Sequence, residues 1–483
     1  MQRQLMILEV SQKQAYIFEP RELRENRRRS KQIERVTSPE YFLEVCTAGE
    51  YTEQNMVYSG GGHTVLQFED AAQAKTFAQK ISLQVLREYP QMELFIKQIP
   101  YDANLTPGQN LNRLTEALEK KKSLRRSSFR TVSMGIEKTV GQGGSADTEP
   151  RTFQGWKLTS DTGRIANDGN FIAVVHIDGN AMGKRVQKIY DTCTSDWDVC
   201  VAKLRQFSEE IDRHFDEAYR EMAQELITAL EARQEDRWNE RILPLRRLIA
   251  AGDDVCFVCT GYLGLECAAR FLQHLSEKTN GADGQKYSAC AGVVLIHTKF
   301  PFRQAYDLSE ALCSNAKVFA AKQGEGISAI DYHIEFGQMK ASLSAIRADY
   351  RTEDGGYLNL RPLAVVGQTA PECQYDFLTT LIDQMQQNQS GLARSKVKGL
   401  RTAFHQGEQE SALALRMTNA GDLLYRGIEK RFPDWMKRTL EGNAPAKEAF
   451  FADSEGKRRC LYFDAIEFAD NTLLWRPVKE ESK

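Results

Sequence analysis

The segments Phe171-Ile172-Ala173-Val174-Val175-His176-Ile177-Asp178-Gly179-Asn180 and Ala251-Gly252-Asp253-Asp254-Val255-Cys256-Phe257-Val258-Cys259 decide the fold. Each holds a continuous apolar run next to a short acidic, glycine-containing turn, which predicts a buried strand that ends or begins at that turn. Arg247-Leu248-Ile249-Ala250 precedes the second turn and predicts the other arm of a hairpin. The sequence therefore predicts a strand and a hairpin in one sheet, with acidic side chains at a shared edge.

The patterns around these segments alternate between strand and helix. A helical pattern covers 196–239, and after the hairpin come helix 263–278, strand 288–297, helix 303–322 and strand 327–332. The order β-α-β-β-α-β-α-β predicts two βαβ crossovers flanking a hairpin. We therefore expect an α+β fold of the split ferredoxin-like kind, in which helices cover one face of an antiparallel sheet.

The N-terminal third repeats this order with different residues. Strand patterns at 5–10, 56–58, 64–68 and 93–99 alternate with helical patterns at 21–46, 71–89 and 111–122. Aligning Thr64-Val65-Leu66 with Val255-Cys256-Phe257 places Gly60-Gly61-Gly62-His63 opposite Ala251-Gly252-Asp253-Asp254, and Ser11 and Gln12 lie near the place of Asp178. The turn is kept while its carboxylates are absent. We predict two domains of one ancestry, of which only the second is equipped for metal chemistry.

The remaining segments define the expected domain organisation. Gly141-Gln142-Gly143-Gly144-Ser145 is typical of a linker, and helical patterns dominate 375–441 before a strand-like tail at 459–463. We expect a first domain at 1–122, a linker at 123–161, a catalytic second domain at 162–340 and a mostly helical C-terminal domain at 341–483. The basic cluster from Lys120 to Arg130 is interpreted as a solvated face, with nucleic-acid contact as the alternative.

Composition excludes several classes of protein. The 483 residues carry 64 basic and 66 acidic side chains, a net charge of -2 that argues against a generic nucleic-acid coat. No window approaches ~18 consecutive apolar residues, so we expect no membrane span, and the start of the chain lacks a signal-peptide pattern. The ten cysteines are scattered, which indicates free thiols in a reducing cytoplasm, and Cys256 and Cys259 fit a buried strand better than a zinc site.

The predicted acidic edge suits divalent metal ions. Asp178, Asp253 and Asp254 should converge there, and clusters of two or three carboxylates suit Mg²⁺ or Mn²⁺. Gly179 and Gly252 would let the backbone approach the ions or a triphosphate. Either motif alone is ordinary hairpin chemistry, but their combination in one sheet favours a site.

The motifs resemble a known family. The chain looks like the large polymerase-like subunit of type III CRISPR effector complexes, which carries two Palm domains, the second with a Gly-Gly-Asp-Asp turn. The residues that carry the resemblance are Ile177-Asp178-Gly179-Asn180-Ala181-Met182-Gly183, Ala251-Gly252-Asp253-Asp254, 305–317, Ile330-Asp331-Tyr332-His333, Ala15-Tyr16-Ile17-Phe18, Gly60-Gly61-Gly62-His63 and, more loosely, 395–400. The family converts ATP into cyclic oligoadenylates, second messengers that switch on antiviral effectors.

The chain also departs from the family's pattern. Ala251 takes the place of the turn's first glycine, which we expect to be tolerated. No histidine is followed by Asp, as the family's N-terminal nuclease domain would require, and the cysteine pairs of its zinc insertion are absent. DNA cleavage is therefore not expected, and the chain resembles a stand-alone CRISPR-type polymerase as much as a subunit of an RNA-guided complex.

The resemblance and the residues together predict a nucleotidyltransferase. We expect it to link ATP or other nucleoside triphosphates to one another, to release pyrophosphate and to cyclise the product. Two Mg²⁺ or Mn²⁺ ions would assist the reaction. Asp178 and Asp253 would be the main metal ligands, and Asp254 would hold a second ion or orient the hydroxyl. Other expected contacts to nucleotide are Gly179, Asn180, Gly252, Lys317 as a triphosphate clamp, Ser59 and His63 for the acceptor, and more weakly Lys184 and Arg185.

Two other functions stay open. One is a non-catalytic Palm scaffold, or a nucleotide- or RNA-binding subunit of a CRISPR effector complex. The other is a cyclase that makes only a dinucleotide or a cyclic mononucleotide. Further expected partners are RNA or other CRISPR-type subunits, and a separate effector protein that reads the product; the base, the ring size, the activating signal and the oligomeric state stay open too.

Overall fold

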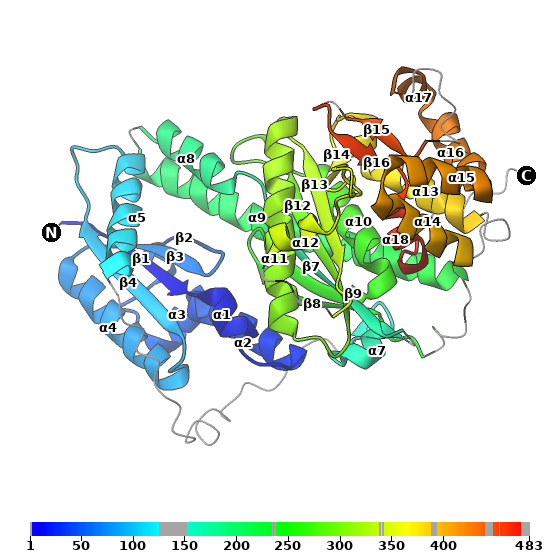
Figure 1. Ribbon diagram of the computed structural model, residues 1–483. Helices are drawn as coiled ribbons and strands as arrows, with labels where there is room; N and C mark the ends of the chain where they lie inside the picture. The colour runs from blue at the N-terminus through cyan, green and yellow to red at the C-terminus, as the bar shows by residue number, and fades with distance from the viewer. Residues whose placement is uncertain are drawn as a thin grey trace, which may run out of the picture.

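The computed structural model describes residues 2–124, 152–167, 169–194, 196–233, 235, 238, 240–337, 340, 342–387, 394–439, 448–453 and 455–474. The smaller of the two main sheets has four strands, and Figure 1 shows it with its helices on one side, the larger sheet in the middle and the C-terminal helices on the far side. Among the described residues, none of the helices combines the length and the apolar character that a membrane span requires.

The first domain is built on the four-stranded sheet, with strand order β2-β3-β1-β4. Its central strand β1 is antiparallel to both neighbours, β3 and β4. This is the strand order of the ferredoxin-like arrangement predicted from the sequence. The elements are β1 (Gln4–Ser11), α1 (Lys13–Phe18), α2 (Leu23–Val36), α3 (Pro39–Val45), β2 (Met56–Gly60), β3 (His63–Phe68), α4 (Ala71–Glu88), β4 (Glu93–Pro100) and α5 (Pro107–Leu124).

The second domain is built on a six-stranded sheet with strand order β14-β13-β12-β7-β9-β8. Strands β12, β7, β9 and β8 repeat the order of the first domain, and β13 extends the sheet by pairing parallel to β12. The elements are β7 (Phe171–Gly179), α8 (Met182–Thr192), α9 (Trp197–Arg233), β8 (Leu245–Ala251), β9 (Asp254–Thr260), α10 (Gly264–Ser276), β12 (Ala289–His297), α11 (Phe302–Gln323), β13 (Ser328–Ile334) and β14 (Leu363–Val366).

Helices cover both faces of the second sheet, whereas the sequence predicted helices on one face only; α11 lies on the second face. Val175 and Ile177 of β7 point into the core that holds α9 and α10, the face expected for this topology. Val174, on the opposite face, packs in a core shared with α11 and with the first domain. There the ring of Phe18 from α1 lies 3.9 Å from that of Tyr306 from α11. The alternation along β7 thus joins the two domains through one sheet.

The C-terminal part is mainly helical, as predicted, and it also contributes to the second sheet. Strand β14, an apolar segment beyond residue 340, pairs with the edge of β13. The elements after β13 are α12 (Leu343–Ala348), α13 (Tyr375–Gln387), α14 (Arg394–Gln406), α15 (Glu408–Thr418), α16 (Ala420–Arg431), α17 (Pro433–Thr439), β15 (Phe450–Ala452), β16 (Arg458–Cys460) and α18 (Phe463–Phe468).

The segment between the two sheets is partly regular. The predicted Gly-rich linker at 141–145 and the basic residues Arg125, Arg126 and Arg130 lie outside the described residues. After that stretch, β5 (Thr152–Phe153) and β6 (Trp156–Lys157) form a short hairpin that buries Trp156. Helix α7 (Thr162–Ala166) then begins at Asp161, whose carboxylate accepts from the backbone N–H of Gly163 at 2.8 Å.

Candidate active site

The sheet brings the three predicted carboxylates together. Asp178 lies near the end of β7, directly opposite Asp254, the first residue of β9. Asp253 sits in the turn just before β9, where its carbonyl accepts from the backbone N–H of Gly179 at 3.3 Å. Because β7 and β9 are adjacent and antiparallel, the end of one strand meets the start of the other. The convergence predicted from the sequence is therefore a consequence of strand register.

Lys317 reaches this edge from α11. Its ammonium lies 2.7 Å from Oδ2 of Asp178 and donates to the carbonyl of Gly179 at 2.8 Å. Burial opposes the charged form, but the neighbouring Asp178 carboxylate raises the pKa of Lys317 above its usual value. The lysine is therefore a firm positive charge beside the acidic turn, where it was predicted to clamp phosphates.

The other two carboxylates repel each other and Asp178. Burial first, and then the Asp178 carboxylate, raise the pKa of Asp253 to about 7. The same two causes raise the pKa of Asp254 to about 7. Within the described residues, Oδ1 of Asp254 is buried and accepts no hydrogen bond. Lys317 offsets this repulsion only in part, and neighbouring like charges in a buried site favour a bound cation or a proton.

These features fit a divalent metal ion. Oδ1 of Asp254, which accepts no hydrogen bond from the described residues and has His176 Nδ1 at 3.5 Å, and the two carboxyl groups with raised pKa values would be stabilised by Mg²⁺ or Mn²⁺, which prefer oxygen ligands. The described residues contain no cluster of three or more His, Cys, Asp or Glu side chains already arranged for coordination. In this structure Lys317, rather than a second carboxylate, is the near neighbour of Asp178.

The glycines of the two motifs are required by close packing. A Cβ on Gly179 would lie 2.9 Å from both Cβ and Oδ2 of Asp253, which is closer than such atoms approach. Gly252 has a φ of +65°, a conformation that residues with a side chain rarely adopt. Asn180 was predicted to contact nucleotide. In the structure its side-chain amide donates to Ile327 O at 3.0 Å and to Ser288 Oγ at 3.3 Å. Asn180 thus ties the end of β7 to neighbouring chain.

Gly179→Ala is predicted to displace the side chain of Asp253. The added methyl group cannot fit, so we expect a loss of about 1–3 kcal/mol in the free energy of unfolding. Mn²⁺ affinity should fall as well, because Asp253 is moved. Chemical denaturation and a Mn²⁺ titration measure the two effects. Gly183→Ala is the matched control, since a Cβ there meets nothing within 4 Å; equal behaviour of the two variants would contradict the assignment.

The raised pKa values predict a pH dependence of stability. With pKa values of about 7 in the folded protein and about 3.8 in the unfolded chain, Asp253 and Asp254 bind protons preferentially in the folded state between these limits. Their contribution to the free energy of unfolding should therefore decrease as pH rises from about 4 to about 7. This contribution is measured as the free energy of unfolding of wild type minus that of the Asp253→Asn, Asp254→Asn variant. Both values come from urea denaturation without metal at each pH. A difference that grows with pH would contradict the prediction.

Asp212 of α9 supports the acidic turn from outside, and no sequence motif pointed to it. Its carboxylate accepts from the backbone N–H of Gly252, while burial raises its pKa to about 6. Ser208, one helical turn earlier on α9, donates to the carbonyl of Ser59 at 2.5 Å. Helix α9 thus holds the turn of the second domain and the corresponding turn of the first domain side by side.

The two turns face each other. The backbone N of Gly61 lies 3.4 Å from where a Cβ of Gly252 would be. Ser59, predicted to contact the acceptor nucleotide, instead directs its hydroxyl into the first domain: it donates to Thr37 O at 2.9 Å and lies 3.0 Å from Thr64 Oγ1. The structure does not bring this hydroxyl to the carboxylates.

His63, the other predicted acceptor contact, opens β3 and lies edge-on to Tyr58, with the ring centroids 5.5 Å apart. Burial, assisted by Lys13 and Lys122, lowers its pKa to about 4. The imidazole is therefore neutral at pH 7 and can donate or accept a hydrogen bond. In register it lies where the second domain has Asp254: His63 pairs with Gly60 across its hairpin as Asp254 pairs with Ala251.

Register also corrects the alignment of the first strands. Asp178 faces Asp254, and the residue that faces His63 is Glu9, so Glu9 and not Ser11 or Gln12 occupies the place of Asp178. The first domain therefore keeps one acid. Lys122 of α5 lies 2.8 Å from Glu9, as Lys317 of α11 lies 2.7 Å from Asp178. Each lysine is fifteen residues after the first residue of its helix.

Arg185 and Lys184 have different surroundings. Arg185 is buried and forms a two-pronged ion pair with Asp283, at 2.7 and 2.8 Å. It also lies over the rings of Phe207 and Tyr287, so it anchors α8 and is not a free phosphate ligand. The weaker prediction for Arg185 is wrong for this reason. Lys184 is exposed in the first turn of α8.

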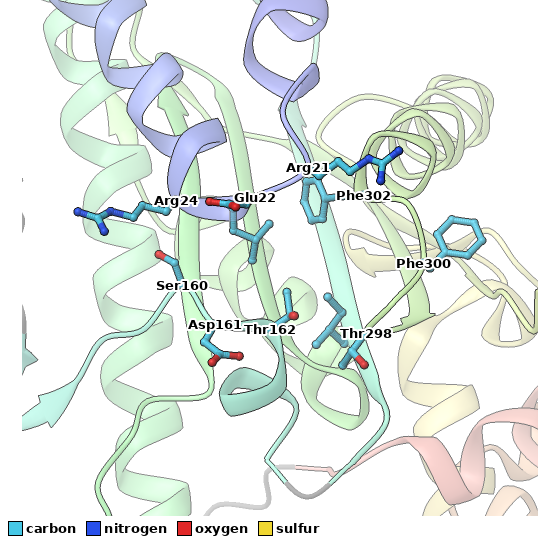
Figure 2. Close-up of a pocket in the computed structure, with 11 residues that line it drawn as sticks. Arg21, Glu22, Arg24, Ser160, Asp161, Thr162, Thr298, Phe300 and Phe302 are labelled. Carbon is cyan, nitrogen blue, oxygen red and sulfur yellow. The ribbon is translucent and has the colours of Figure 1, made fainter. Parts of the chain in front are cut away.

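A hollow elsewhere on the molecule contains none of the predicted site residues. It has a volume of about 520 Å³ and lies at the start of β7, the end opposite Asp178. Figure 2 shows Arg21, Glu22 and Arg24 on one side of it and Ser160, Asp161, Thr162 and Thr298 on the other. Asp161 is occupied in capping α7. The predicted carboxylates and Lys317 therefore lie at the carboxylate edge and not in this hollow.

Comparison with known proteins supports the resemblance seen in the motifs. Residues 171–324 match the family described as Cas10/Cmr2, second palm domain. That range begins at β7 and ends just after α11, so it contains all three carboxylates and Lys317. No curated protein matches the chain in sequence.

Solved structures match nearly the whole chain. The Csm1-Csm4 cassette in complex with pppApApA is 14% identical with a TM-score of 0.59, over 98% of this chain and 70% of that chain. The same cassette in complex with cA4 is 14% identical with a TM-score of 0.58, over 98% of this chain and 70% of that chain. Csm1 in T. onnurineus is 13% identical with a TM-score of 0.57, over 97% of this chain and 69% of that chain. The likeness to a Cas10-type subunit and the α+β fold with antiparallel Palm sheets are confirmed.

Proposed function

We propose that the protein is a metal-dependent nucleotidyltransferase that makes cyclic oligonucleotides from ATP or other nucleoside triphosphates. The observation that carries the proposal is the arrangement of Asp178, Asp253 and Asp254 at one sheet edge with Lys317 beside them. The match of this region to the Cas10/Cmr2 second palm domain and the likeness to a cassette solved with pppApApA and with cA4 support it.

Each residue has a distinct part in the proposed reaction. Asp178 and Asp253 would be the main metal ligands. Asp254 would either contribute to binding a second ion or orient the attacking hydroxyl. Bound Mg²⁺ or Mn²⁺ would lower the pKa of that hydroxyl and neutralise the triphosphate. Lys317 would bind the β- and γ-phosphates, exchanging its contact with Asp178 for one with substrate. Gly179 leaves room for the side chain of Asp253, and Gly252 allows the positive φ of the acidic turn, so both glycines would hold the turn in the shape that the reaction uses.

The bond changes follow from this arrangement. A ribose hydroxyl oxygen of the acceptor nucleotide attacks the α-phosphorus of the donor, and the bond from that phosphorus to the bridging oxygen of the β-phosphate breaks. The hydroxyl proton passes to a neighbouring carboxylate or to water, and pyrophosphate leaves. The same step between the two ends of a linear product closes the ring. A separate effector protein would read the cyclic product.

Incubation of the purified protein with Mg²⁺ or Mn²⁺ and each nucleoside triphosphate, followed by mass spectrometry, tests the proposal. We expect phosphodiester-linked products from at least one triphosphate, and the masses distinguish linear, cyclic dinucleotide and larger cyclic products. Tight nucleotide binding with no product from any triphosphate, under both metals, would instead favour a non-catalytic nucleotide-binding Palm subunit.

A role within a multi-subunit complex is the second proposal, and one observation favours it. The structural matches include Csm1-Csm4 cassettes, in which the Csm1 chain is solved with a partner subunit. We propose that this chain too binds a further CRISPR-type subunit, with RNA as an additional partner. Co-purification of the tagged chain from its native cells, followed by mass spectrometry of the proteins and nuclease treatment of any nucleic acid, tests this role.

A further inference from the structure

Lys13 projects from the first domain toward the acidic edge of the second domain. It is the first residue of α1, just after β1, and its ammonium donates to the carbonyl of Gly61 in the first-domain turn. Gly61 in turn lies against Gly252, the glycine that precedes Asp253. The next residue, Gln14, donates to Glu310 of α11 at 2.9 Å. The start of α1 is thus held at the junction of the two domains.

The surroundings of Lys13 are shaped for its side chain. Gly62 has a φ of +76°, and a Cβ there would lie 2.9 Å from Cε of Lys13, so glycine suits both the turn and the lysine that crosses it. In register Gly62 takes the place of Asp253. Where the second domain has an aspartate, the first domain therefore has a gap filled by a lysine from its own helix.

The charge of Lys13 is incompletely balanced. Among the described residues no carboxylate lies within ion-pair distance of it, and its polar contact is a backbone carbonyl. Glu9, a neighbouring acid, is already paired with Lys122 at 2.8 Å. Burial lowers the pKa of Lys13, whereas Glu9, Asp254 and Asp253 act in the opposite direction, so the lysine senses the acidic edge without contacting it. A partly buried ammonium without a counter-ion favours an anionic ligand.

We infer that Lys13 is a substrate-contacting residue of the proposed reaction, which binds a phosphate oxygen of the nucleotide at Asp253 and Asp254 in addition to Lys317. The inference rests on the proposed function for the identity of the anion. It gives the first domain a task that needs no metal-binding acids: it supplies a positive charge across the domain junction. Lys317 comes from the second domain and Lys13 from the first, so the triphosphate would be neutralised from both.

The position of Lys13 also makes the site dependent on domain docking. The ammonium is held near the acidic edge, through its contact with Gly61, only while the turn at Gly61 rests on the turn at Gly252 and α9 holds both. A phosphate bound by Lys13 and by the second domain would therefore bridge the two domains. Nucleotide binding should accordingly depend on a residue that lies outside the 171–324 range matched by the palm family.

Lys13→Met, Lys13→Arg and a control, Lys75→Met, test the inference in the full chain. Lys75 is an exposed lysine on α4, so its replacement makes the same change in net charge away from the site. The measurements are product formation from ATP, affinity for AMPPNP with Mn²⁺, affinity for Mn²⁺ alone, and thermal unfolding. We expect Lys13→Met to lower turnover about 100-fold and AMPPNP affinity about 10-fold, with Mn²⁺ affinity not reduced. Lys13→Arg should recover part of both losses, and Lys75→Met should behave as wild type.

The outcomes separate this inference from the proposed function. Wild-type turnover in Lys13→Met would overturn the role of Lys13 and leave the enzyme proposal standing. If wild type makes no product, the proposed reaction fails, but a selective loss of AMPPNP affinity in Lys13→Met would still support the phosphate contact. Loss of Mn²⁺ affinity or of thermal stability in both Lys13→Met and Lys13→Arg would show a structural role for Lys13 and overturn the inference.

Discussion

The Asp253→Asn, Asp254→Asn double variant is expected to lose product formation by at least about 100-fold, while its fold is kept or stabilised near pH 8. Two of the three carboxylates lose their charge, so the affinity of the edge for Mg²⁺ and Mn²⁺ should fall with them. The same change removes the repulsion that raises the pKa of Asp253 and Asp254 to about 7. Lower activity together with equal or higher stability distinguishes a lost metal site from a damaged fold.

Asp191→Asn provides the matched control for the double variant. Asp191 is an exposed acid on α8 of the same domain, where it accepts from Gln187 at 2.9 Å. Its neutralisation should leave turnover and Mn²⁺ affinity unchanged. The measurements are initial rates with ATP, Mn²⁺ titration followed by electron paramagnetic resonance, and urea denaturation at pH 8. Full turnover by the double variant would remove the metal assignment of both aspartates.

Arg361→Met is expected to destabilise the protein more than any surface substitution, by about 3–5 kcal/mol in the free energy of unfolding. Arg361 is fully buried and lies 2.7 Å from Asp464 and 2.5 Å from Glu467, two carboxylates of α18 that are also buried. It donates to Tyr332 O of β13 at 2.8 Å as well. The arginine thus joins the C-terminal part to the second sheet, and its loss leaves two buried carboxylates without their main partner.

Two further variants make the Arg361 prediction specific. Arg458→Met removes a comparable arginine from an exposed pair with Glu408, and we expect a loss below about 1 kcal/mol. The triple variant Arg361→Met, Asp464→Asn, Glu467→Gln should be more stable than Arg361→Met alone, because neutral amides are less costly to bury than unpaired carboxylates. Denaturant unfolding measures all three. Similar losses for Arg361→Met and Arg458→Met would contradict the proposed weight of the buried cluster.

The carboxylate edge could be predicted from the sequence because its parts are local. Asp178 lies next to the last residue of an apolar strand, Asp253 lies in a hairpin turn and Asp254 begins the next strand, so each position follows from a strand boundary. The ferredoxin-like order then makes those strands neighbours. The same reasoning located Gly60-Gly61-Gly62-His63 opposite the acidic turn, and the register confirms this alignment.

Other parts of the site depend on long-range contacts that leave no local signal. Glu9 interrupts an apolar strand, a pattern that is typical of a solvent-exposed residue. The strand register nevertheless places Glu9 at the position that corresponds to Asp178. The helices that follow these two strands begin after Gln12 and Ala181, both with positive φ, a correspondence that residue types do not reveal. Lys13 lies near the acidic edge only because the two domains dock. Arg185 forms an ion pair with Asp283, which lies far along the chain.

The sharpest single test of the account is the stoichiometry of pyrophosphate release. Wild-type protein with ATP and Mg²⁺ should release one pyrophosphate for each phosphodiester bond found in the product by mass spectrometry. The Asp253→Asn, Asp254→Asn variant should release none above background, although it remains folded. Binding of ATP by wild type with no pyrophosphate released, under Mg²⁺ and under Mn²⁺, would contradict the claim that this carboxylate edge performs nucleotidyl transfer.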